Sequence, residues 1–254
     1  MISIAERHKF ILDSLKKDGF VKVTDMAEAL KVTTVTIRKD FKYLEDKKLL
    51  YRTHGSASPI NPLASDIKVI EKEKIKRDEK KRIAIAACKL IEENDLIIVG
   101  SGSTVYCFAE NLKPITHLTV VTASLKVSIL LTDLPNVDVL QLGGTIRKKS
   151  ISVIGDYTTH FFEDVTCSKL FLGVDGIDLE YGITNSNIEE AQLNKKMMHA
   201  SLRTIVLADS SKFGRRGFGK ICELDKIDVI ITDSGISESM AKKVEEAGVE
   251  LIIA

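Results

Sequence analysis

Cysteine is scarce in this 254-residue chain, and its positions do not suggest pairing. The four cysteines are scattered, without the short spacings of a zinc site or the density of a disulfide framework: Cys88, Cys107, Cys167 and Cys222. No nucleophile-and-base context surrounds any of them. We interpret them as reduced core thiols, and we expect no bound metal, no cofactor and no catalytic residue.

A long apolar run is also missing. No stretch of about eighteen apolar residues occurs, which argues against a membrane-spanning helix or a membrane partner. The first six residues show no signal-peptide pattern, so we expect a cytoplasmic protein. A composition of 44% hydrophobic and 29% charged residues is ordinary for a globular protein, and the length suits one large or two modest domains.

The net charge of +1 hides a strong asymmetry. Residues 1–82 carry 20 basic and 13 acidic side chains, a net charge of +7, whereas residues 83–254 carry 17 and 23, a net charge of −6. A basic amino-terminal module is attracted to phosphodiester, and an acidic larger domain is repelled by it. The asymmetry supports DNA binding by the first part, although either half is also compatible with an ordinary solvated surface.

The most informative stretch runs from Val32 to Gly55. Its apolar residues recur at helical spacing, and Val35 is expected to pack inward with Ile37, Phe41 and Leu44. The opposite face carries short hydroxyls followed by long cations, a pattern that suits a helix in the DNA major groove. For this helix alone, an amphipathic helix with a solvated basic face is the alternative. The candidate DNA contacts here are Thr33, Thr34, Thr36, Arg38, Lys39 and Lys42.

The neighbouring segments favour the DNA-binding interpretation. Ser3 and Glu6 fit a capping box, and a first helix over about 5–17 follows. A short second helix begins near Thr24 and turns directly into the third, which resembles a helix-turn-helix. Residues 49–53 then predict a strand that enters a turn, the wing of a winged helix, where Arg52 and His54 are further candidates for DNA backbone contact. We expect a winged helix-turn-helix domain over residues 1–58.

This segment resembles the amino-terminal signature of the DeoR family of bacterial sugar-metabolism regulators, written T-I-R-R-D-L…L-E…G-L-I-x-R-x-H-G-G-A. The matching residues run from Thr36-Ile37-Arg38-Lys39-Asp40-Phe41 to Arg52-Thr53-His54-Gly55-Ser56-Ala57. Lys39 replaces a second arginine, and Ser56 replaces the second glycine. Lysine keeps the charge but lacks the planar fork of arginine, so a phosphate contact suits Lys39 better than a base contact.

A boundary follows the wing. Two prolines and small residues between Pro59 and Ser65 suit an interdomain linker, which we place at residues 59–75. The stretch 66–94 favours one or two helices. Its charge run over 71–82 is interpreted as a solvated face, with DNA backbone contact as the alternative.

The larger domain, residues 76–254, alternates short apolar runs with helical ones. This pattern predicts a parallel sheet in an α/β fold, with ligands at the carboxyl ends of the strands. The predicted strands are 96–99, 118–121, 137–140, 169–172, 204–207 and 229–232.

The loop after the first of these strands has the composition of an anion site. Glycines permit close backbone approach, a helix amino terminus offers free N–H groups, and hydroxyls donate further hydrogen bonds. A phosphate is the natural occupant, and a simple strand-to-helix turn is the alternative. The loop comprises Gly100, Ser101, Gly102, Ser103 and Thr104.

The loops after the following strands match the order of the DeoR effector domain. That resemblance implies a ribose-5-phosphate-isomerase-like fold, a phosphorylated sugar as effector, and oligomerisation as a homodimer or homotetramer. In the family, Gly100 is commonly aspartate, Ser103 threonine and Ala123 asparagine. Further candidate effector residues are Thr122, Ala123, Ser124, Gly143, Gly144, Arg147, Asp175, Gly176, Asn187, Glu190 and Lys212. For Lys212 and Arg147 a solvated surface position is the alternative, and for Asp175 a structural role in the turn.

Two alternatives to an effector-controlled regulator stay open. The loop from Asp175 to Asp178 resembles an acidic loop of the isomerase, which raises the possibility of an active isomerase fused to a DNA-binding module. Residues 182–187 lack the isomerase lysine, however, so we predict no enzymatic activity. The second alternative is a constitutive architectural DNA-binding protein. We predict a regulator, in the repressor class, of a carbohydrate-utilisation operon, with double-stranded operator DNA and a sugar phosphate as partners.

Overall fold

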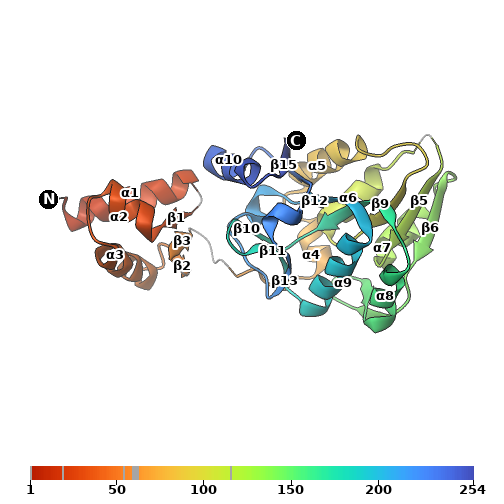
Figure 1. Cartoon of the computed structure of the whole chain (residues 1–254), viewed down its shortest axis with the longest axis horizontal. Helices are drawn as coiled ribbons and strands as arrows, with labels where there is room; N and C mark the ends of the chain where they lie inside the picture. Colours follow the sequence, from red (N-terminus) through yellow and green to blue (C-terminus); the bar gives the residue numbers. More distant parts are fainter. Residues whose placement is uncertain (1, 19, 54, 59–62, 115) are drawn as a thin grey trace. The chain divides into compact units, whose positions relative to one another are not determined.

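The computed structural model of the chain describes residues 2–18, 20–53, 55–58, 63–114 and 116–254. The chain forms two compact units (Figure 1). The smaller unit comprises residues 1–63 and 237–242, and the larger comprises residues 64–236 and 243–254. No helix within the described residues is long and apolar enough to cross a membrane.

The smaller unit has the predicted winged helix-turn-helix arrangement. Three short strands form an antiparallel sheet in the order β1-β3-β2, beside three helices. The elements in chain order are α1 (Ile4–Asp18), β1 (Val21–Lys22), α2 (Val23–Ala29), α3 (Thr34–Asp46), β2 (Tyr51–Thr53) and β3 (Ser56–Ser58).

The apolar stripes of the three helices meet in one core. Ile37, Phe41 and Leu44 of α3 are each at most 1% exposed, as the periodicity predicts. The capping box is also confirmed, because Ser3 Oγ accepts the Glu6 N–H at 3.2 Å and the Ser3 N–H donates to the Glu6 carboxylate at 3.0 Å. The prediction that Val35 packs inward is wrong. Val35 is 56% exposed, because its position in the first turn of α3 points away from the core.

The turn between α2 and α3 is closed by a residue in the left-handed region. Lys31 has φ of 51°, and its N–H donates to Glu28 O at 3.1 Å. The next N–H, of Val32, donates to Ala27 O at 3.0 Å. These two bonds satisfy carbonyls at the end of α2 and form the Schellman pattern that ends many helices. The turn thereby sets the direction in which α3 begins.

The larger unit is built on a seven-stranded, fully parallel sheet in the order β15-β14-β12-β9-β4-β5-β6. All six predicted strands are present, and β15 is an additional edge strand. The strands are β4 (Leu96–Val99), β5 (Leu118–Thr122), β6 (Val137–Gln141), β9 (Cys167–Gly173), β12 (Ser201–Leu207), β14 (Val229–Thr232) and β15 (Glu250–Ile253).

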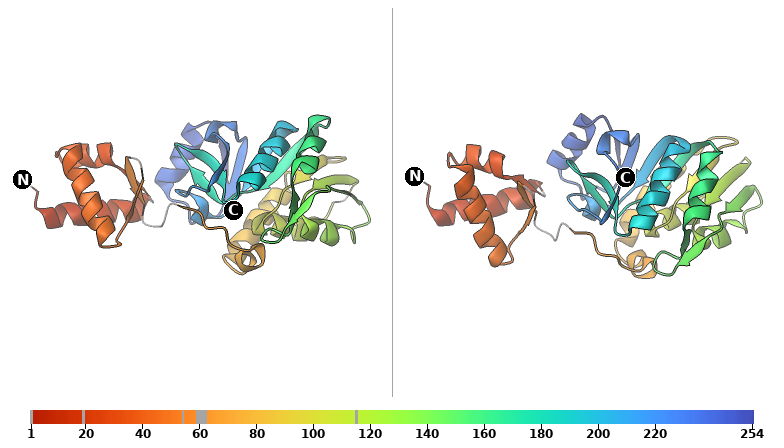
Figure 2. Two further views of the ribbon diagram at one scale, coloured as in Figure 1. Left: turned by 90° about the horizontal axis from the view of Figure 1, so that it is seen from below. Right: turned by 60° about the horizontal axis from the view of Figure 1, so that its bottom comes forward.

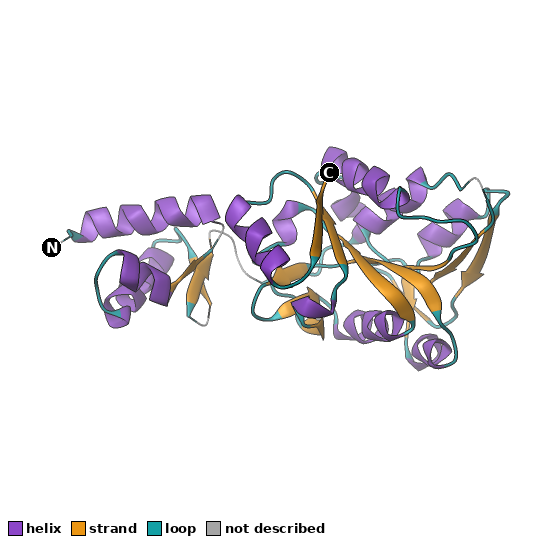
Figure 3. Ribbon diagram, turned by 45° about the horizontal axis from the view of Figure 1, so that its top comes forward, coloured by secondary structure: helices purple, strands orange, loops and turns teal. Residues whose placement is uncertain are grey.

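Helices cover both faces of this sheet (Figures 2 and 3). Buried side chains of α5, α6 and α7 share one hydrophobic cluster with the sheet, whereas α9 packs against β9 and β12 outside that cluster. The helices after residue 64 are α4 (Val69–Glu73), α5 (Arg77–Cys88), α6 (Ser103–Asn111), α7 (Leu125–Leu131), α8 (Asp156–His160), α9 (Ile188–His199) and α10 (Glu238–Glu246). The short 3₁₀ turns are η1 (Phe161–Glu163), η2 (Ser210–Lys212) and η3 (Leu224–Lys226).

Five short strands form two small antiparallel sheets that the sequence analysis did not predict. One sheet has the order β10-β11-β13 and the other is the hairpin β7–β8. Their bounds are β7 (Thr145–Arg147), β8 (Ser152–Ile154), β10 (Gly176–Asp178), β11 (Gly182–Asn185) and β13 (Gly219–Cys222).

The strand order reverses between β4 and β9. From β4 the chain proceeds outward through β5 to β6, and it then returns to β9 on the other side of β4 before continuing to β12. In an open parallel sheet, the crevice at the carboxyl ends of the two strands that flank such a reversal is the usual ligand site. The loops after Val99 and Gly173 flank this crevice.

The predicted domain limits stay predictions, but residues 64–75 have a defined place in the larger unit. They contain α4, and the Val69 N–H donates to Lys149 O at 2.8 Å. The predicted helical stretch 66–94 contains α4 and α5, in agreement with the expected one or two helices.

Candidate functional site

The start of α3 is fixed by its own threonines. Thr33 is the N-cap residue, and its hydroxyl accepts the Thr36 N–H at 3.2 Å. The hydroxyls of Thr33 and Thr36 are 2.9 Å apart and hydrogen-bonded. Side-chain capping satisfies one of the free N–H groups at a helix start, where the dipole is positive. The predicted hydroxyl contacts therefore lie together at the amino-terminal end of the helix that carries the cations.

The three predicted cations of α3 are exposed. Arg38, Lys39 and Lys42 make no ion pair within the part of the chain that the structure describes. Their charges are thus available to a phosphate or to the edge of a guanine. Thr34 and Thr36 are half-buried beside them. This arrangement is what a recognition helix requires, with polar side chains on one face and the buried Ile37–Leu44 stripe on the other.

The wing supplies one more predicted contact. Arg52 on β2 is exposed, and its Nε lies 2.6 Å from Glu45 Oε2 of α3. An exposed pair of this kind contributes about 0–1 kcal/mol to stability, so a DNA phosphate can replace Glu45 at little cost. His54, the other predicted wing contact, lies outside the described residues.

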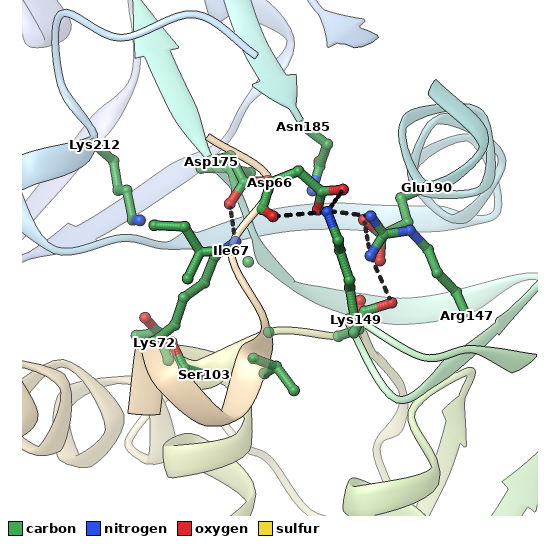
Figure 4. A pocket seen from close by; sticks show the side chains of 17 residues that line it. Asp66, Ile67, Lys72, Ser103, Arg147, Lys149, Asp175, Asn185, Glu190 and Lys212 are labelled. Atoms are coloured by element: carbon green, nitrogen blue, oxygen red, sulfur yellow. Dashed lines mark hydrogen bonds and ion pairs between the residues drawn. The ribbon is translucent and has the colours of Figure 1, made fainter. Parts of the chain in front are cut away.

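A polar pocket lies at the switch point of the larger unit, between the loops that follow β4 and β9 (Figure 4). Segments far apart in sequence meet there, and the cavity between them measures about 40 Å³. The lining residues are Asp66, Ile67, Val69, Lys72, Ser101, Gly102, Ser103, Thr104, Arg147, Lys149, Ser150, Gly173, Val174, Asp175, Asn185, Glu190 and Lys212.

The loop before α6 approaches β9 closely. Gly102, the N-cap of α6, has φ of 119°, which favours glycine. A Cβ on Gly173 would lie 2.8 Å from Ser101 O, so that position also requires glycine. Ser103 and Thr104 are buried in the first turn of α6. The helix amino terminus and its two hydroxyls therefore border the pocket, as an anion site requires.

Asp175, directly after β9, is held by an ion pair and two hydrogen bonds. Lys72 Nζ lies 2.6 Å from Asp175 Oδ1. The Ser186 N–H and hydroxyl donate to Asp175 Oδ2 at 2.9 and 2.6 Å. Burial alone raises the pKa of the Asp175 carboxyl, but the charge of Lys72 and these hydrogen bonds outweigh burial and lower it. Asp175 is therefore a fixed, ionised acceptor.

Arg147 joins two carboxylates at the other end of the pocket. Its Nη2 lies 2.6 Å from Asp66 Oδ1, and its Nη1 lies 3.6 Å from Glu190 Oε2. Burial raises the pKa of Glu190, because hydrogen bonding with Ser150 and the charge of Arg147 only partly offset its desolvation. The Arg147 guanidinium thus lies within reach of both acids.

Lys212 reaches the pocket from η2, and Figure 4 shows no interaction drawn to its amino group. Its Nζ makes no hydrogen bond or ion pair with the described residues. Burial lowers the pKa of Lys212, and the charges of Asp209 and Asp175 only partly offset this effect. Lys212 is half-buried. A partly buried ammonium without a close partner is unfavourable, and an anion bound beside it relieves that cost.

Half of the predicted effector residues line this pocket. Eight of them, Ser101, Gly102, Ser103, Thr104, Arg147, Asp175, Glu190 and Lys212, come together there. The other eight lie outside its lining and stay predictions: Gly100, Thr122, Ala123, Ser124, Gly143, Gly144, Gly176 and Asn187.

Several of the eight outside the lining have structural roles. The Thr122 hydroxyl accepts the Ser124 N–H at 3.0 Å, and Ser124 in turn caps α7. Asn187 caps α9 through the Glu190 N–H. Gly144 has φ of 146°, and a Cβ there would lie 2.7 Å from Ile154 O. These contacts position the loops around the pocket.

Nine lining residues were not predicted from the sequence. Asp66 and Lys72 lie in the segment interpreted as a linker and a solvated charge run, and Lys149 follows Arg147 in a basic tripeptide. For these three charged residues, the only signal in the sequence is the excess of charge in the stretches that contain them. The nine are Asp66, Ile67, Val69, Lys72, Lys149, Ser150, Gly173, Val174 and Asn185. No group of three or more metal-ligating side chains occurs among the described residues.

Two family models match the chain, one for each part. Residues 7–62 match the DeoR-like helix-turn-helix domain, and residues 75–234 match the DeoR C-terminal sensor domain. The second match alone spans more than half of the chain. The protein is therefore a two-domain regulator with a DNA-binding module and a sensor module. It belongs to the DeoR family of transcriptional regulators, as the signature around Arg38 predicted.

Relatives match over nearly their whole length. The chain is 35% identical to the uncharacterized HTH-type transcriptional regulator YulB of Bacillus subtilis, over 98% of this chain and 96% of that protein. It is 32% identical to the lactose phosphotransferase system repressor of Streptococcus mutans, over 93% and 95%. It is 29% identical to the transcriptional repressor GlcR of Bacillus subtilis, over 98% and 95%.

Solved structures are similar at a lower level. Ribose 5-phosphate isomerase A of Methanocaldococcus jannaschii matches 54% of each chain, with a TM-score of 0.38 and 18% identity. The β subunit of eIF2B from Chaetomium thermophilum matches 63% of this chain and 49% of its own, with a TM-score of 0.43 and 16% identity. These values are too low to say anything about activity.

Proposed function

We propose that this protein represses a carbohydrate-utilisation operon, and that a phosphorylated sugar in the sensor pocket releases it from operator DNA. The relatives named above as a lactose phosphotransferase system repressor and as the repressor GlcR support this class of target. In the proposal, α3 enters the major groove. Arg38 with Thr34 and Thr36 contacts base edges, and Lys39, Lys42 and Arg52 contact phosphates.

One module of this size makes few contacts with DNA, so binding by a homodimer or homotetramer is part of the proposal. Two modules bound to repeated half-sites reach the affinity that a specific regulator needs. The sensor domain carries the oligomer contacts in this account. Its acidic net charge keeps it off the phosphodiester backbone.

The observation that carries the sensor half of the proposal is Lys212. Its ammonium is partly buried, has no close partner among the described residues, and shares a pocket with the amino terminus of α6. A phosphate between these groups receives charge from Lys212, N–H groups from α6 and hydroxyls from Ser103 and Thr104. Asp175 and Glu190 supply carboxylate acceptors for the hydroxyls of the sugar.

A thermal-shift screen of the full chain tests this proposal. The panel contains ribose 5-phosphate, glucose 6-phosphate, fructose 1-phosphate and fructose 6-phosphate, each beside its unphosphorylated sugar. A ligand at a hundredfold excess over Kd stabilises the protein by about 2.7 kcal/mol. We expect stabilisation by at least one phosphate and by none of the free sugars. Equal melting shifts for a phosphorylated sugar and its free sugar would show that Lys212 does not bind the phosphate group.

The matched variants are Lys212→Gln and Lys148→Gln. Both remove one positive charge, but Lys148 is exposed and lies outside the pocket lining. A hydrogen bond to a charged group is worth about 1.5–3 kcal/mol, so Lys212→Gln should weaken binding of the sugar phosphate about 10- to 150-fold. Lys148→Gln should leave it within about twofold of wild type. The isomerase alternative is checked with the same ligands, since an enzyme interconverts ribose 5-phosphate and its ketose.

A further inference from the structure

Residues 64–69, here called the strap, cross the sensor pocket. The Ala64 N–H donates to Arg216 O and the Val69 N–H donates to Lys149 O, each at 2.8 Å. Asp66, Ile67 and Val69 of the strap line the pocket. The strap follows the smaller unit in sequence and leads directly into α4. It is therefore the part of the sensor pocket nearest in sequence to the DNA-binding module.

The Asp66 carboxylate holds the strap in place. Its two oxygens are bound separately, Oδ1 by Arg147 Nη2 at 2.6 Å and Oδ2 by Lys149 Nζ at 2.9 Å. Lys149 Nζ also donates to Asp66 O at 3.0 Å. Figure 4 shows this carboxylate directed toward both cations. Arginine and lysine bind a phosphate or a ligand carboxylate through the same oxygen geometry.

The cavity that the strap and the other lining segments enclose is small. A cavity of about 40 Å³ holds a few water molecules, whereas small-molecule sites measure about 300–1,000 Å³. A sugar phosphate thus requires some of the lining to move. The strap contributes little buried apolar surface, because Ile67 is 38% exposed and only Val69 is buried. Segments with few buried contacts open at low free-energy cost.

We infer that Arg147 and Lys149 form an anion subsite that Asp66 of the same chain fills, and that a phosphate or carboxylate group of the effector displaces Asp66 and releases the strap. The inference rests on the proposed sensor function and adds to it a second cationic position, separate from Lys212. Binding at this position frees the strap, which belongs to the segment that joins the sensor to the DNA-binding module. Differential binding of this kind is what allosteric control requires.

The test uses the full chain, inorganic phosphate as the probe, and hydrogen exchange of residues 64–75 as the readout. Phosphate should speed exchange of the Val69 amide in the wild type, whereas potassium chloride at the same ionic strength should not. In Asp66→Asn the exchange should already be fast without phosphate. The control is Glu71→Gln, which removes an exposed negative charge outside the pocket lining and should behave as wild type.

Phosphate affinity, measured by calorimetry, gives the second readout. If Asp66 fills the subsite in about 90% of molecules or more, its removal tightens phosphate binding about tenfold or more. Weaker or unchanged binding by Asp66→Asn overturns the inference. So does slower exchange of the strap with phosphate, or no response to phosphate in either protein. The proposed function fails separately, if no sugar phosphate stabilises the full chain while the strap still responds to inorganic phosphate.

Discussion

Arg7 of α1 and Asp40 of α3 form a bidentate ion pair in the interior of the smaller unit. Arg7 Nε lies 2.5 Å from Asp40 Oδ2, and Arg7 Nη2 lies 2.8 Å from Asp40 Oδ1. The two residues are 8% and 5% exposed. Burial raises the pKa of Asp40, but hydrogen bonds from Arg7 and His8 outweigh burial and lower it. The pair fixes the recognition helix against α1.

Replacement of Asp40 should therefore destabilise the DNA-binding unit. Asp40→Ala leaves the Arg7 guanidinium buried without its partner, and breaking a buried pair in this way costs about 3–5 kcal/mol. The measurement is urea unfolding of the full chain, followed by a probe in the smaller unit.

Asp46→Ala is the matched control, because Asp46 is an exposed acid at the end of the same helix. It should change stability by less than about 0.5 kcal/mol. A similar small effect of Asp40→Ala would show that the pair does not hold α3.

Arg38 should carry sequence specificity. Arg38→Ala should weaken operator binding by about 1–3 kcal/mol, because a bidentate contact to guanine is lost. Non-specific DNA binding should weaken much less. Fluorescence anisotropy with operator and scrambled duplexes measures both. Lys9→Ala, an exposed cation on α1, serves as the control. An unchanged ratio of the two affinities would assign Arg38 to the DNA backbone.

Lys80 should make the stability of the larger unit depend on pH. Its amino group donates to Lys72 O at 2.5 Å and to Ile75 O at 2.7 Å, and burial lowers its pKa to about 8. Between about pH 8 and the ordinary lysine pKa of about 10.4, the unfolded chain binds more protons than the folded chain. Stability should therefore rise with pH across this window.

Lys80→Met removes that titration. Urea unfolding at several pH values between 8 and 10 should show a smaller rise for Lys80→Met than for the wild type. Parallel curves for the two proteins would mean that Lys80 titrates at its ordinary pKa. Lys81→Met, an exposed neighbour on α5, controls for the loss of a charge.

The main elements of the fold were predictable because their residues carry a local signal. Short, mostly apolar runs marked six strands, and the stripe from Ile37 to Leu44 marked α3. The edge strand β15 was missed; none of its residues is buried, and only Leu251 and Ile252 are half-buried. The small sheets were missed for a different reason. Strands such as β10 and β11 have three or four residues and lack polar–apolar alternation, and tertiary packing places them.

The pocket was predictable only in part, because tertiary packing also brings together part of its lining. Ser101 to Thr104 are consecutive residues at the start of α6, and their composition indicates an anion site. Asp66 and Lys72 reach the same cavity from a segment that looks like a solvated linker, because a charged residue has the same local pattern whether it faces water or a cavity. The ion pair of Lys72 with Asp175 joins residues more than a hundred positions apart, and no local spacing indicates it.

The decisive measurement is the release of operator DNA by a sugar phosphate. Host genomic fragments enriched by the full chain supply the operator, and anisotropy gives its Kd with and without each phosphate from the thermal-shift panel. A phosphate that stabilises the protein should weaken operator binding about 5- to 150-fold, the usual range of allosteric coupling. Lys212→Gln should reduce this response. Operator binding that stays the same at saturating concentrations of a bound phosphate would contradict the claim.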